Sequence, residues 1–247
     1  PYVSLALCDG LLFLEAIKNP HAPWATLAAG TAVLMIVIAL RQMTAVRENA
    51  RLVSEEFASE RQALEAQLIH QAFHDPLTGL ANRALFVDRV AHALARCSRS
   101  GSTLAVLFLD LDNFKTVNDS LGHAAGDTLL VAAAVRLVAC VRTSDTVARL
   151  GGDEFAMLIE DASEDMSATV AAERITTALR EPFAIEGKEV FVTASVGIAV
   201  SGGDGPQATT VNDANATDLL RNADMAMYTA KASGKARYET FERRMHW

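Results

Sequence analysis

Two aspartates stand where a protein could hold a cation. Asp110 directly follows the apolar run 104–109, and Asp153 follows two glycines in a turn between two further apolar runs. The ends of buried strands are where sites form in open α/β sheets. Two facing carboxylates repel each other unless a cation lies between them, and hard oxygen ligands favour magnesium. The alternative for either aspartate alone is a turn or helix-cap residue, so the prediction depends on the pair.

There is a physical reason for two glycines, Gly151 and Gly152, next to these carboxylates. A tight hairpin turn with positive φ requires glycine, and the absence of a Cβ atom lets phosphate groups approach the backbone. A Gly-Gly turn alone is common and is usually only a turn. Because it is followed by Asp-Glu-Phe at 153–155, with Asp110 upstream, it becomes a strong signal for a catalytic hairpin.

The surrounding elements alternate in a way that would position this hairpin. We expect strands at 104–109, 146–150, 155–159 and 190–200, and helices at 84–96, 113–121, 126–140, 169–179 and 216–232. A surface loop rich in glycine and polar residues is expected at 201–215. The order βαββαβ, with an extra helix at each end, indicates an α/β fold of the α+β type. We therefore expect a ferredoxin-like sandwich, with a mostly antiparallel central sheet and helices on both faces.

The N-terminal part has the composition of a membrane segment. Residues 25–40 are almost wholly apolar, which predicts a transmembrane helix at about 22–40, with a buried core helix as the alternative. We assign 1–40 to the membrane part, in which 2–17 fits the end of an earlier span. Because Arg41 and further arginines follow, we expect the C-terminal side in the cytoplasm and the chain in the inner (plasma) membrane.

Residues 41–73 are predicted to form a charged signalling helix without glycine or proline. An apolar stripe at alternating steps of three and four, interrupted at Glu60, consists of Met43, Val46, Ala50, Val53, Phe57 and Leu64. This short and imperfect heptad pattern favours a parallel coiled coil, and so a homodimer. The alternative is a single amphipathic helix that lies on the following domain.

Charge and cysteine content exclude several classes of protein. The 247-residue chain has a formal net charge of −8 and no lysine- or arginine-rich run, which argues against nucleic-acid binding. The three cysteines are far apart and have no metal-ligand spacing, so we expect no disulfide framework. The six histidines include no HExxH motif. No Gly-x-Ser-x-Gly elbow and no Walker loop occur, which argues against a hydrolase or a P-loop NTPase.

Taken in order, these motifs resemble the GGDEF family of diguanylate cyclases. The signature stands at 151–155, and the domain-opening motif DPLTGLANR stands at 75–83. Between them lies FLDLDNFK at 108–115, and ADMAMY follows near the end at 223–228. The resemblance implies a GGDEF cyclase domain at 74–241.

The resemblance implies an enzyme that condenses two GTP molecules into cyclic di-GMP, which is also an inhibitor. Magnesium would be the cofactor, with manganese as an alternative. Asp110, Asp153 and the main-chain carbonyl of Leu111 look like the metal ligands. Glu154 is similar to the family's active-site glutamate near the attacking ribose 3′-hydroxyl, and whether it is the general base stays open. Since one domain holds one GTP, the product requires two facing domains.

The resemblance also implies how GTP is bound. Asn118 and Asp127 are similar to the residues that read guanine. This fits their chemistry, because a carboxylate accepts from the N–H donors of guanine and an amide pairs with either kind of group. Lys115, Lys231 and Lys235 would neutralise the triphosphate. The family more often has arginine at the last of these positions, which would add a bidentate fork.

A second ligand site is implied before the hairpin. Arg142 and Asp145 match the RxxD motif that mediates product inhibition in the family. Arginine offers a fork to phosphate or to a guanine edge, and aspartate accepts from guanine. Arg174 resembles a secondary arginine of that site, with a solvated helix charge as the alternative.

Two other functions stay open. A degenerate, non-catalytic module would bind GTP or cyclic di-GMP and signal through partners, although such members usually lose the hairpin carboxylates that are present here. The chain could also be the cyclase half of a bifunctional cyclase/phosphodiesterase. The segment 242–247 resembles the start of the linker that often leads into an EAL phosphodiesterase domain.

Overall fold

The chain forms two compact units, Pro1–Gln67 and Leu68–Trp247. A computed structural model describes residues 10, 11, 14, 15, 17, 18, 23–160, 168–201, 208, 209, 215–242 and 245. The apolar segment predicted at 2–17, the loop at 201–215 and the linker at 242–247 therefore lie largely outside the described residues.

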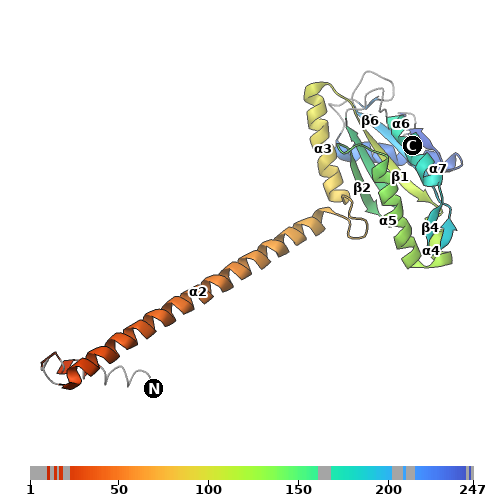
Figure 1. Cartoon of the computed structure of the whole chain (residues 1–247). Helices are drawn as coiled ribbons and strands as arrows, with labels where there is room; N and C mark the ends of the chain where they lie inside the picture. The colour runs from red at the N-terminus through yellow and green to blue at the C-terminus, as the bar shows by residue number, and fades with distance from the viewer. Residues whose placement is uncertain are drawn as a thin grey trace. The chain divides into compact units, whose positions relative to one another are not determined.

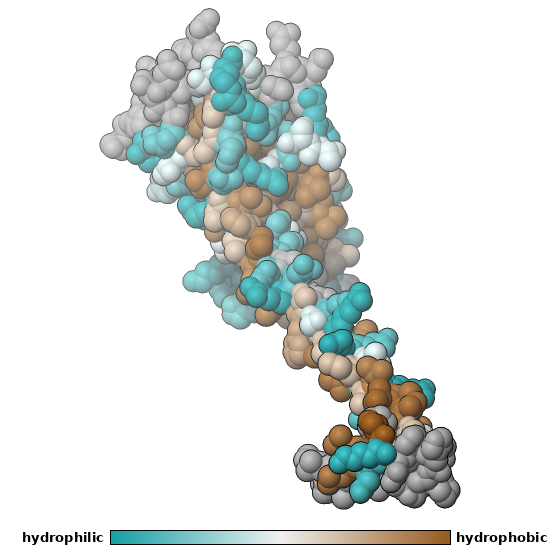
Figure 2. All heavy atoms as spheres, turned by 90° about the vertical axis from the view of Figure 1, so that its left-hand side faces the viewer, coloured by the Kyte–Doolittle hydropathy of each residue, from teal (hydrophilic) through white to brown (hydrophobic). Residues whose placement is uncertain are grey.

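One helix, α2 (Pro23–Phe73), contains both the predicted transmembrane segment and the predicted signalling helix, with no break between them. Within Ala29–Phe73, an 18-residue window has a mean hydropathy of 1.7, and none of that window is buried. Val33 and Ile36 are among its exposed hydrophobic residues, and Figure 2 shows hydrophobic surface along the N-terminal part of α2. By length and composition alone, α2 is able to cross a membrane.

The second unit is built on one sheet of six strands (Figure 1). The strand order is β2-β3-β1-β6-β7, and β8 also pairs with β6. Neighbouring strands run antiparallel in β2–β3, β3–β1 and β1–β6, whereas β7 and β8 run parallel to β6. The bounds are β1 Leu104–Asp112, β2 Thr146–Gly151, β3 Glu154–Glu160, β6 Thr193–Ser201, β7 Ala208–Thr209 and β8 Tyr238–Thr240.

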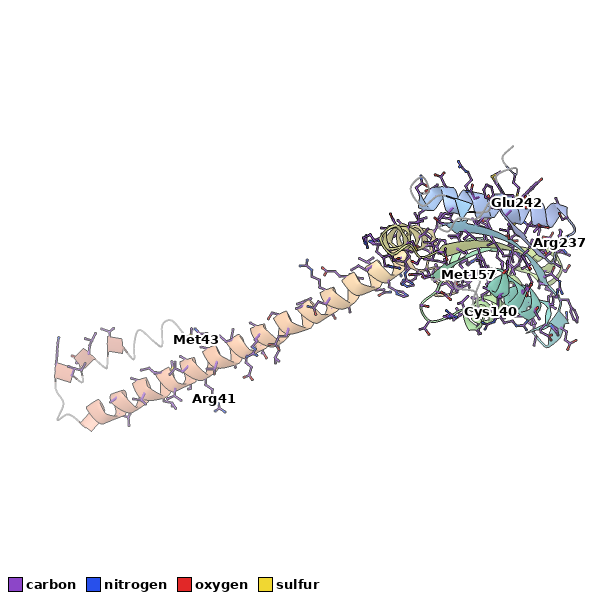
Figure 3. All side chains as sticks on the ribbon, turned by 90° about the horizontal axis from the view of Figure 1, so that it is seen from above. Arg41, Met43, Cys140, Met157, Arg237 and Glu242 are labelled. Atoms are coloured by element: carbon purple, nitrogen blue, oxygen red, sulfur yellow. The ribbon has the colours of Figure 1, made fainter. Side chains whose placement is uncertain are left out.

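Helices cover both faces of this sheet (Figures 1 and 3). One face carries α3 and α7, and the other carries α5 and α6. The bounds are α3 Arg83–Ser100, α4 Phe114–Leu121, α5 His123–Ala139, α6 Ala168–Arg180 and α7 Ala216–Ala232. The predicted ferredoxin-like sandwich, with a mostly antiparallel sheet between two helical layers, is confirmed.

The central strand β1 is buried along its whole length. Its side chains alternate between two cores, because successive residues of a strand point to opposite faces. Leu107 and Leu109 pack in the core with α5 and α6, whereas Val106 and Phe108 pack in the core with α3 and α7. Burial on both faces explains why the run 104–109 is continuously apolar.

Strand β1 also continues past its predicted end at residue 109, as far as Asp112. The Asp112 side chain is only 2% exposed. It accepts hydrogen bonds from Thr193 Oγ1 at 2.7 Å and from Ser195 Oγ at 2.8 Å, both on β6. Two hydroxyl donors therefore keep a charged residue inside the sheet, a partnership that the local sequence pattern does not contain.

The strand predicted at 190–200 is divided in the structure. β5 (Lys188–Val190) ends before β6 begins, and it forms a separate hairpin with β4 (Phe183–Ile185). The turn of this hairpin uses Glu186 at φ 48° and Gly187 at φ 77°. Strands of three residues are too short to show an alternating pattern, so the sequence does not predict this hairpin.

Glycine at position 197 of β6 allows α7 to lie directly on the sheet. A Cβ atom at Gly197 would be 1.9 Å from the Ala223 carbonyl oxygen and 2.1 Å from the Met227 nitrogen, both backbone atoms of α7. Backbone cannot move aside as a flexible side chain can. Gly197 therefore sets the depth at which α7 packs, and with it the position of Lys231 near the end of that helix.

Replacing Gly197 by Ala should destabilise the second unit by about 3 kcal/mol, because the new methyl group overlaps the α7 backbone. Thermal unfolding should show a melting temperature lower by roughly 10 °C. Gly30 is a suitable control, since no atom lies within 4 Å of a Cβ atom there. Equal melting temperatures for Gly197→Ala and Gly30→Ala would contradict this packing argument.

Candidate functional site

The glycines shape the turn between β2 and β3. Gly151 pairs with Glu154 across the hairpin, which leaves Gly152 and Asp153 as the turn residues. The φ angles are 149° at Gly151 and 52° at Gly152, a region that L side chains rarely adopt. No atom lies within 4 Å of a Cβ atom at either glycine. Backbone conformation therefore requires glycine here, and the open space leaves room for a ligand.

The sheet brings the two predicted aspartates together from distant parts of the sequence. Strand pairing places Asp110 opposite Glu154. The Leu111 backbone N–H donates to the Asp153 carbonyl oxygen at 3.3 Å, which joins the end of β1 to the hairpin turn. The end of β1 and the turn therefore form one continuous acidic surface, as the sequence predicts.

Lys231 of α7 neutralises part of this surface. Its Nζ lies 2.7 Å from Asp110 Oδ2. Burial and the nearby Asp153 carboxylate raise the pKa of Asp110 above its ordinary value, although the hydrogen bond from Lys231 opposes this rise. The sequence predicts Lys231 on the triphosphate, whereas in the structure it contacts the predicted metal ligand itself.

The donors at this position fit a hard cation. Asp110 and Asp153 offer carboxylate oxygens and Leu111 adds a carbonyl, the ligand types that magnesium prefers. Among the described residues, no group of three His, Cys, Asp or Glu side chains could hold a metal. Mg²⁺ commonly takes one or two carboxylates and completes its shell with water and substrate phosphates.

Two charged residues near Glu154, Asp224 and Arg83, have no role that the sequence predicts. Burial, with the neighbouring Asp224 and Asp110 carboxylates, raises the pKa of Glu154, and the Arg83 guanidinium opposes the rise. Burial also raises the pKa of Asp224, against the attraction of Lys231 and Arg83. Both residues stand in motifs of the family resemblance, but a motif does not reveal that Asp224 and Arg83 lie near enough to shift the pKa of Glu154.

Asn118 and Asp127, the residues predicted to bind guanine, lie on α4 and α5. Asn118 Oδ1 is buried and, within the described residues, has no hydrogen-bond partner. A Cβ atom at Gly126 would lie 1.9 Å from that oxygen, so the glycine leaves the space that the amide occupies. Asp127 follows directly and is exposed. A buried oxygen without a donor is costly, which points to a ligand N–H as its partner.

Two of the predicted phosphate-binding lysines lie on different elements, Lys115 on α4 and Lys235 in the turn after α7. Lys115 is exposed in the first turn of α4. Lys235 donates from Nζ to Asn113 Oδ1 at 2.9 Å. It stands in a turn where Gly234, Lys235 and Ala236 all have positive φ. The Ala236 N–H donates to Asp112 Oδ2 at 3.1 Å, so the same buried carboxylate that binds β6 also holds this turn.

Arg149 connects the hairpin to the start of the domain. Its Nε and Nη2 donate to the Gly152 carbonyl oxygen at 3.0 and 2.8 Å, and its Nη1 lies 3.1 Å from both carboxylate oxygens of Asp75. Both side chains are largely buried, at 13% and 15% exposed. Burial raises the pKa of Asp75, but hydrogen bonds from Thr78 and Arg149 hold it below its ordinary value.

The RxxD residues lie at the other end of β2, about 20 Å from the hairpin at 3.3 Å per residue. Asp145 is buried, and its oxygens accept from the backbone N–H groups of Arg142, at 2.8 Å, and Glu160, at 3.3 Å. Arg142 is exposed. Arg174 of α6 is also exposed and lines a cavity of about 500 Å³ with Cys140. Asp145 thus holds the turn, which leaves Arg142 as the freely presented member of the motif.

Comparison with known proteins identifies the family. Residues 72–237 match the family described as "Diguanylate cyclase, GGDEF domain". The chain is 46% identical over 180 residues to the bifunctional diguanylate cyclase/cyclic di-GMP phosphodiesterase MucR of Pseudomonas aeruginosa, covering 73% of this chain and 25% of MucR. It is 40% identical over 202 residues to the diguanylate cyclase TpbB of the same species, covering 79% of this chain and 44% of TpbB. The chain thus spans less than half of either relative.

Among solved structures, the coiled coil and GGDEF domain of DgcB from Caulobacter crescentus, in complex with cyclic di-GMP, superposes with a TM-score of 0.65. The two chains are 26% identical, and the match covers 78% of this chain and 98% of DgcB.

Replacing Glu154 by Gln should stabilise the protein in the absence of divalent cations. Because burial and like charges raise the pKa of Glu154, its folded form holds the proton more tightly than its unfolded form. Stability is therefore lost as the pH rises through that raised pKa. In thermal unfolding, Glu154→Gln should melt above the wild type at neutral pH.

The difference should vanish below pH 4.5, the ordinary pKa of glutamate, where both states are protonated. Glu181→Gln, at an exposed position, is the matched control and should change little. A Glu154→Gln variant that melts below the wild type at neutral pH would contradict the repulsion.

Proposed function

Since this chain belongs to the GGDEF family of diguanylate cyclases, we propose that it condenses two GTP molecules into cyclic di-GMP and releases two pyrophosphates. The observation that carries the proposal is the junction of Asp110 with the turn Gly151–Glu154, joined by the Leu111–Asp153 backbone hydrogen bond. Both the acidic ligands and the open glycine turn of a phosphoryl-transfer site are present there. Degenerate members of the family usually lose the hairpin carboxylates.

In the proposed reaction, the ribose 3′-hydroxyl of one GTP attacks the α-phosphorus of the other, and pyrophosphate leaves. Asp110, Asp153 and the Leu111 carbonyl would hold magnesium, with manganese as a substitute. When bound, the cation supplies charge neutralisation on the phosphates. Glu154 lies on the strand that pairs with β1 and is available to the attacking hydroxyl. Burial and the neighbouring carboxylates raise the pKa of Glu154, which is the direction that favours proton exchange by a carboxyl group.

Guanine specificity is proposed to come from Asn118 and Asp127. The unpartnered, buried Asn118 Oδ1 supports this, because guanine carries N–H donors on its edge. Asp127 would accept further donors from the same base. Adenine has no N1–H donor, so the carboxylate would be left without that partner.

The triphosphate is proposed to lie between the glycine turn and three lysines. Lys115 and Lys235 flank the start of α4, where Lys235 already contacts Asn113. Lys231 pairs with Asp110. We propose that Lys231 turns towards the phosphates when a cation takes its place beside Asp110. Gly151 and Gly152 have no Cβ atoms to block the approach.

A homodimer is required by this chemistry, because one domain holds one GTP. The apolar stripe of α2 supports a parallel pairing, and Val53 and Phe57 of that stripe are exposed in the single chain. The solved structure of DgcB, which contains a coiled coil and a GGDEF domain, is consistent with such an arrangement. A rotation or register change of the paired helices would then bring the two sites together or apart.

We also propose that the chain is held at the inner membrane by the N-terminal part of α2, with the cyclase domain in the cytoplasm. The support is the unburied hydrophobic window of that helix and the arginines that follow it. Residues 1–40 would be the membrane part, 41–73 the signalling helix and 74–241 the cyclase domain.

A second candidate is the cyclase half of a bifunctional protein. MucR, of which this chain matches 25%, is named as both cyclase and phosphodiesterase. In that case net turnover in the cell would depend on both activities, whereas the reaction at the GGDEF site would be the same.

Replacing Asp153 by Ala should reduce cyclic di-GMP formation from GTP to below about one hundredth of the wild-type rate. The reason is that one of two carboxylate ligands is lost. The assay is turnover of the purified full chain with magnesium and GTP, followed by chromatography of the product. Asp88→Ala, at a solvent-accessible carboxylate on α3, is the matched control. Wild-type chain that binds GTP without forming product would favour a non-catalytic module.

Replacing Arg142 by Ala should relieve product inhibition without lowering the initial rate. Arg142 is exposed at the opposite end of β2 from the hairpin, so its loss removes a phosphate partner but leaves the turnover site intact. We expect the inhibition constant for cyclic di-GMP to rise by about tenfold or more. Arg221→Ala, at an exposed pair with Asp218, serves as the control. Unchanged inhibition in Arg142→Ala would remove the RxxD assignment.

A further inference from the structure

His70, in the last turn of α2, and His74, directly after the last residue of that helix, form a paired arrangement that the proposed cyclase reaction does not use. The His74 N–H donates to the His70 carbonyl oxygen at 2.9 Å, so the helical hydrogen-bond pattern extends to His74 and the two side chains, four residues apart, lie on one face. Their rings are stacked, with centroids 4.1 Å apart and an interplanar angle of 13°. Two histidines at this spacing on a helix can bind one metal ion, as in zinc enzymes. No HExxH motif is needed for that geometry.

The hydrogen bond made by the His74 ring leaves its Nε2 nitrogen available for a metal. Its Nδ1 lies 3.2 Å from the His70 carbonyl oxygen. A carbonyl oxygen only accepts, so Nδ1 carries the proton and Nε2 of the neutral ring keeps its lone pair. A ring N–H bound to a backbone carbonyl is the usual way in which a protein orients a metal-binding imidazole. His70 is exposed, so its ring can turn to bring a second lone pair to the same ion.

The backbone around His74 is held in place before any metal binds. His74 forms an isolated bridge with Ala81. The Asn82 N–H donates to the Phe73 carbonyl oxygen at 2.9 Å, and Asn82 Nδ2 donates to the Ala72 carbonyl oxygen at 2.8 Å. His74 also lines an open cavity of about 690 Å³, which gives an ion access from solvent. One ligand is thus positioned by the fold, and the other can adjust.

We propose that His70 and His74 bind a divalent transition-metal ion of the zinc class, shared with the same two histidines of a second copy of this chain. Imidazole ligands favour zinc, copper and nickel, whereas the carboxylate site beside Asp110 favours magnesium. Two imidazoles fill half of the tetrahedral shell that zinc adopts in structural sites. A second copy paired along α2 supplies the other half. The shared site rests on the homodimer proposed above.

Such a site would tie the two chains together where α2 enters the cyclase domain. Through the bridge with Ala81, whose carbonyl oxygen accepts from the Arg149 N–H at 2.9 Å, the ion would stiffen the support of the catalytic hairpin. Zinc binding and dimer formation would then be linked, because an ion that binds only the dimer stabilises it.

The test is zinc binding to the full chain, prepared without a polyhistidine tag and kept in excess magnesium, which occupies carboxylate sites. Competition with a chromogenic chelator gives affinity and stoichiometry. We expect one zinc ion for two chains, and an affinity more than about tenfold weaker in His70→Ala and in His74→Ala. His92→Ala is the matched control, because His92 is an exposed histidine on α3 and should leave zinc binding unchanged.

Sedimentation should show that zinc tightens dimer formation of the wild type but not of the two variants. Unchanged zinc affinity in the His70→Ala, His74→Ala double variant would overturn the site, and one zinc ion per chain would overturn its sharing. Magnesium-dependent turnover of GTP by the same variants in the absence of zinc reports the cyclase separately. If the chain makes cyclic di-GMP but fails the zinc test, the zinc site is refuted and the proposed cyclase function stands.

Discussion

The geometry of the site depends on one guanidinium group. Arg149 binds both oxygens of Asp75 and the carbonyl oxygen of Gly152 in a largely buried position. A single nitrogen, Nη1, contacts both Asp75 oxygens, and charge-assisted hydrogen bonds of this kind are among the stronger ones in proteins. They join the first turn of the domain to the turn that carries Asp153. The hairpin glycines permit the backbone conformation of the turn. The hydrogen bonds from Arg149 then fix the position of the turn relative to the start of the domain.

Around this fixed turn, the protein gathers groups that repel one another. Asp110, Glu154 and Asp224 all have pKa values raised by burial, and two of the three are raised further by neighbouring carboxylates. Lys231 and Arg83 relieve part of the repulsion. Such a cluster costs stability in the absence of a cation, and sites of this kind are usually retained because ligand binding needs them. The packing of α7 against Gly197 holds Lys231 where it can balance the charge.

The sequence predicts the fold class, the helical layers and the meeting of Asp110 with the hairpin, because these follow from periodicity and from the order of the elements. It does not predict the β4–β5 hairpin, whose strands are too short for a pattern. The roles of Arg149 and Asp112 are also not predicted, because Asp75 lies 74 residues from Arg149 and the β6 partners of Asp112 lie 81 and 83 residues from it. Arg83 and Asp224 stand in motifs of the family, but only the folded arrangement shows that both lie near enough to Glu154 to shift its pKa.

The strand that carries the glycine signature lies at one end of the sheet order, β2-β3-β1-β6-β7. An outermost strand offers unpaired backbone groups to any other chain, which invites edge-to-edge aggregation. Here Ala81 forms a parallel bridge with Ala148 and accepts from the Arg149 N–H. The segment around Ala81, which opens the domain, therefore covers part of the edge of strand β2. Neighbouring copies of the chain at high concentration therefore find fewer unpaired backbone groups along β2 to pair with.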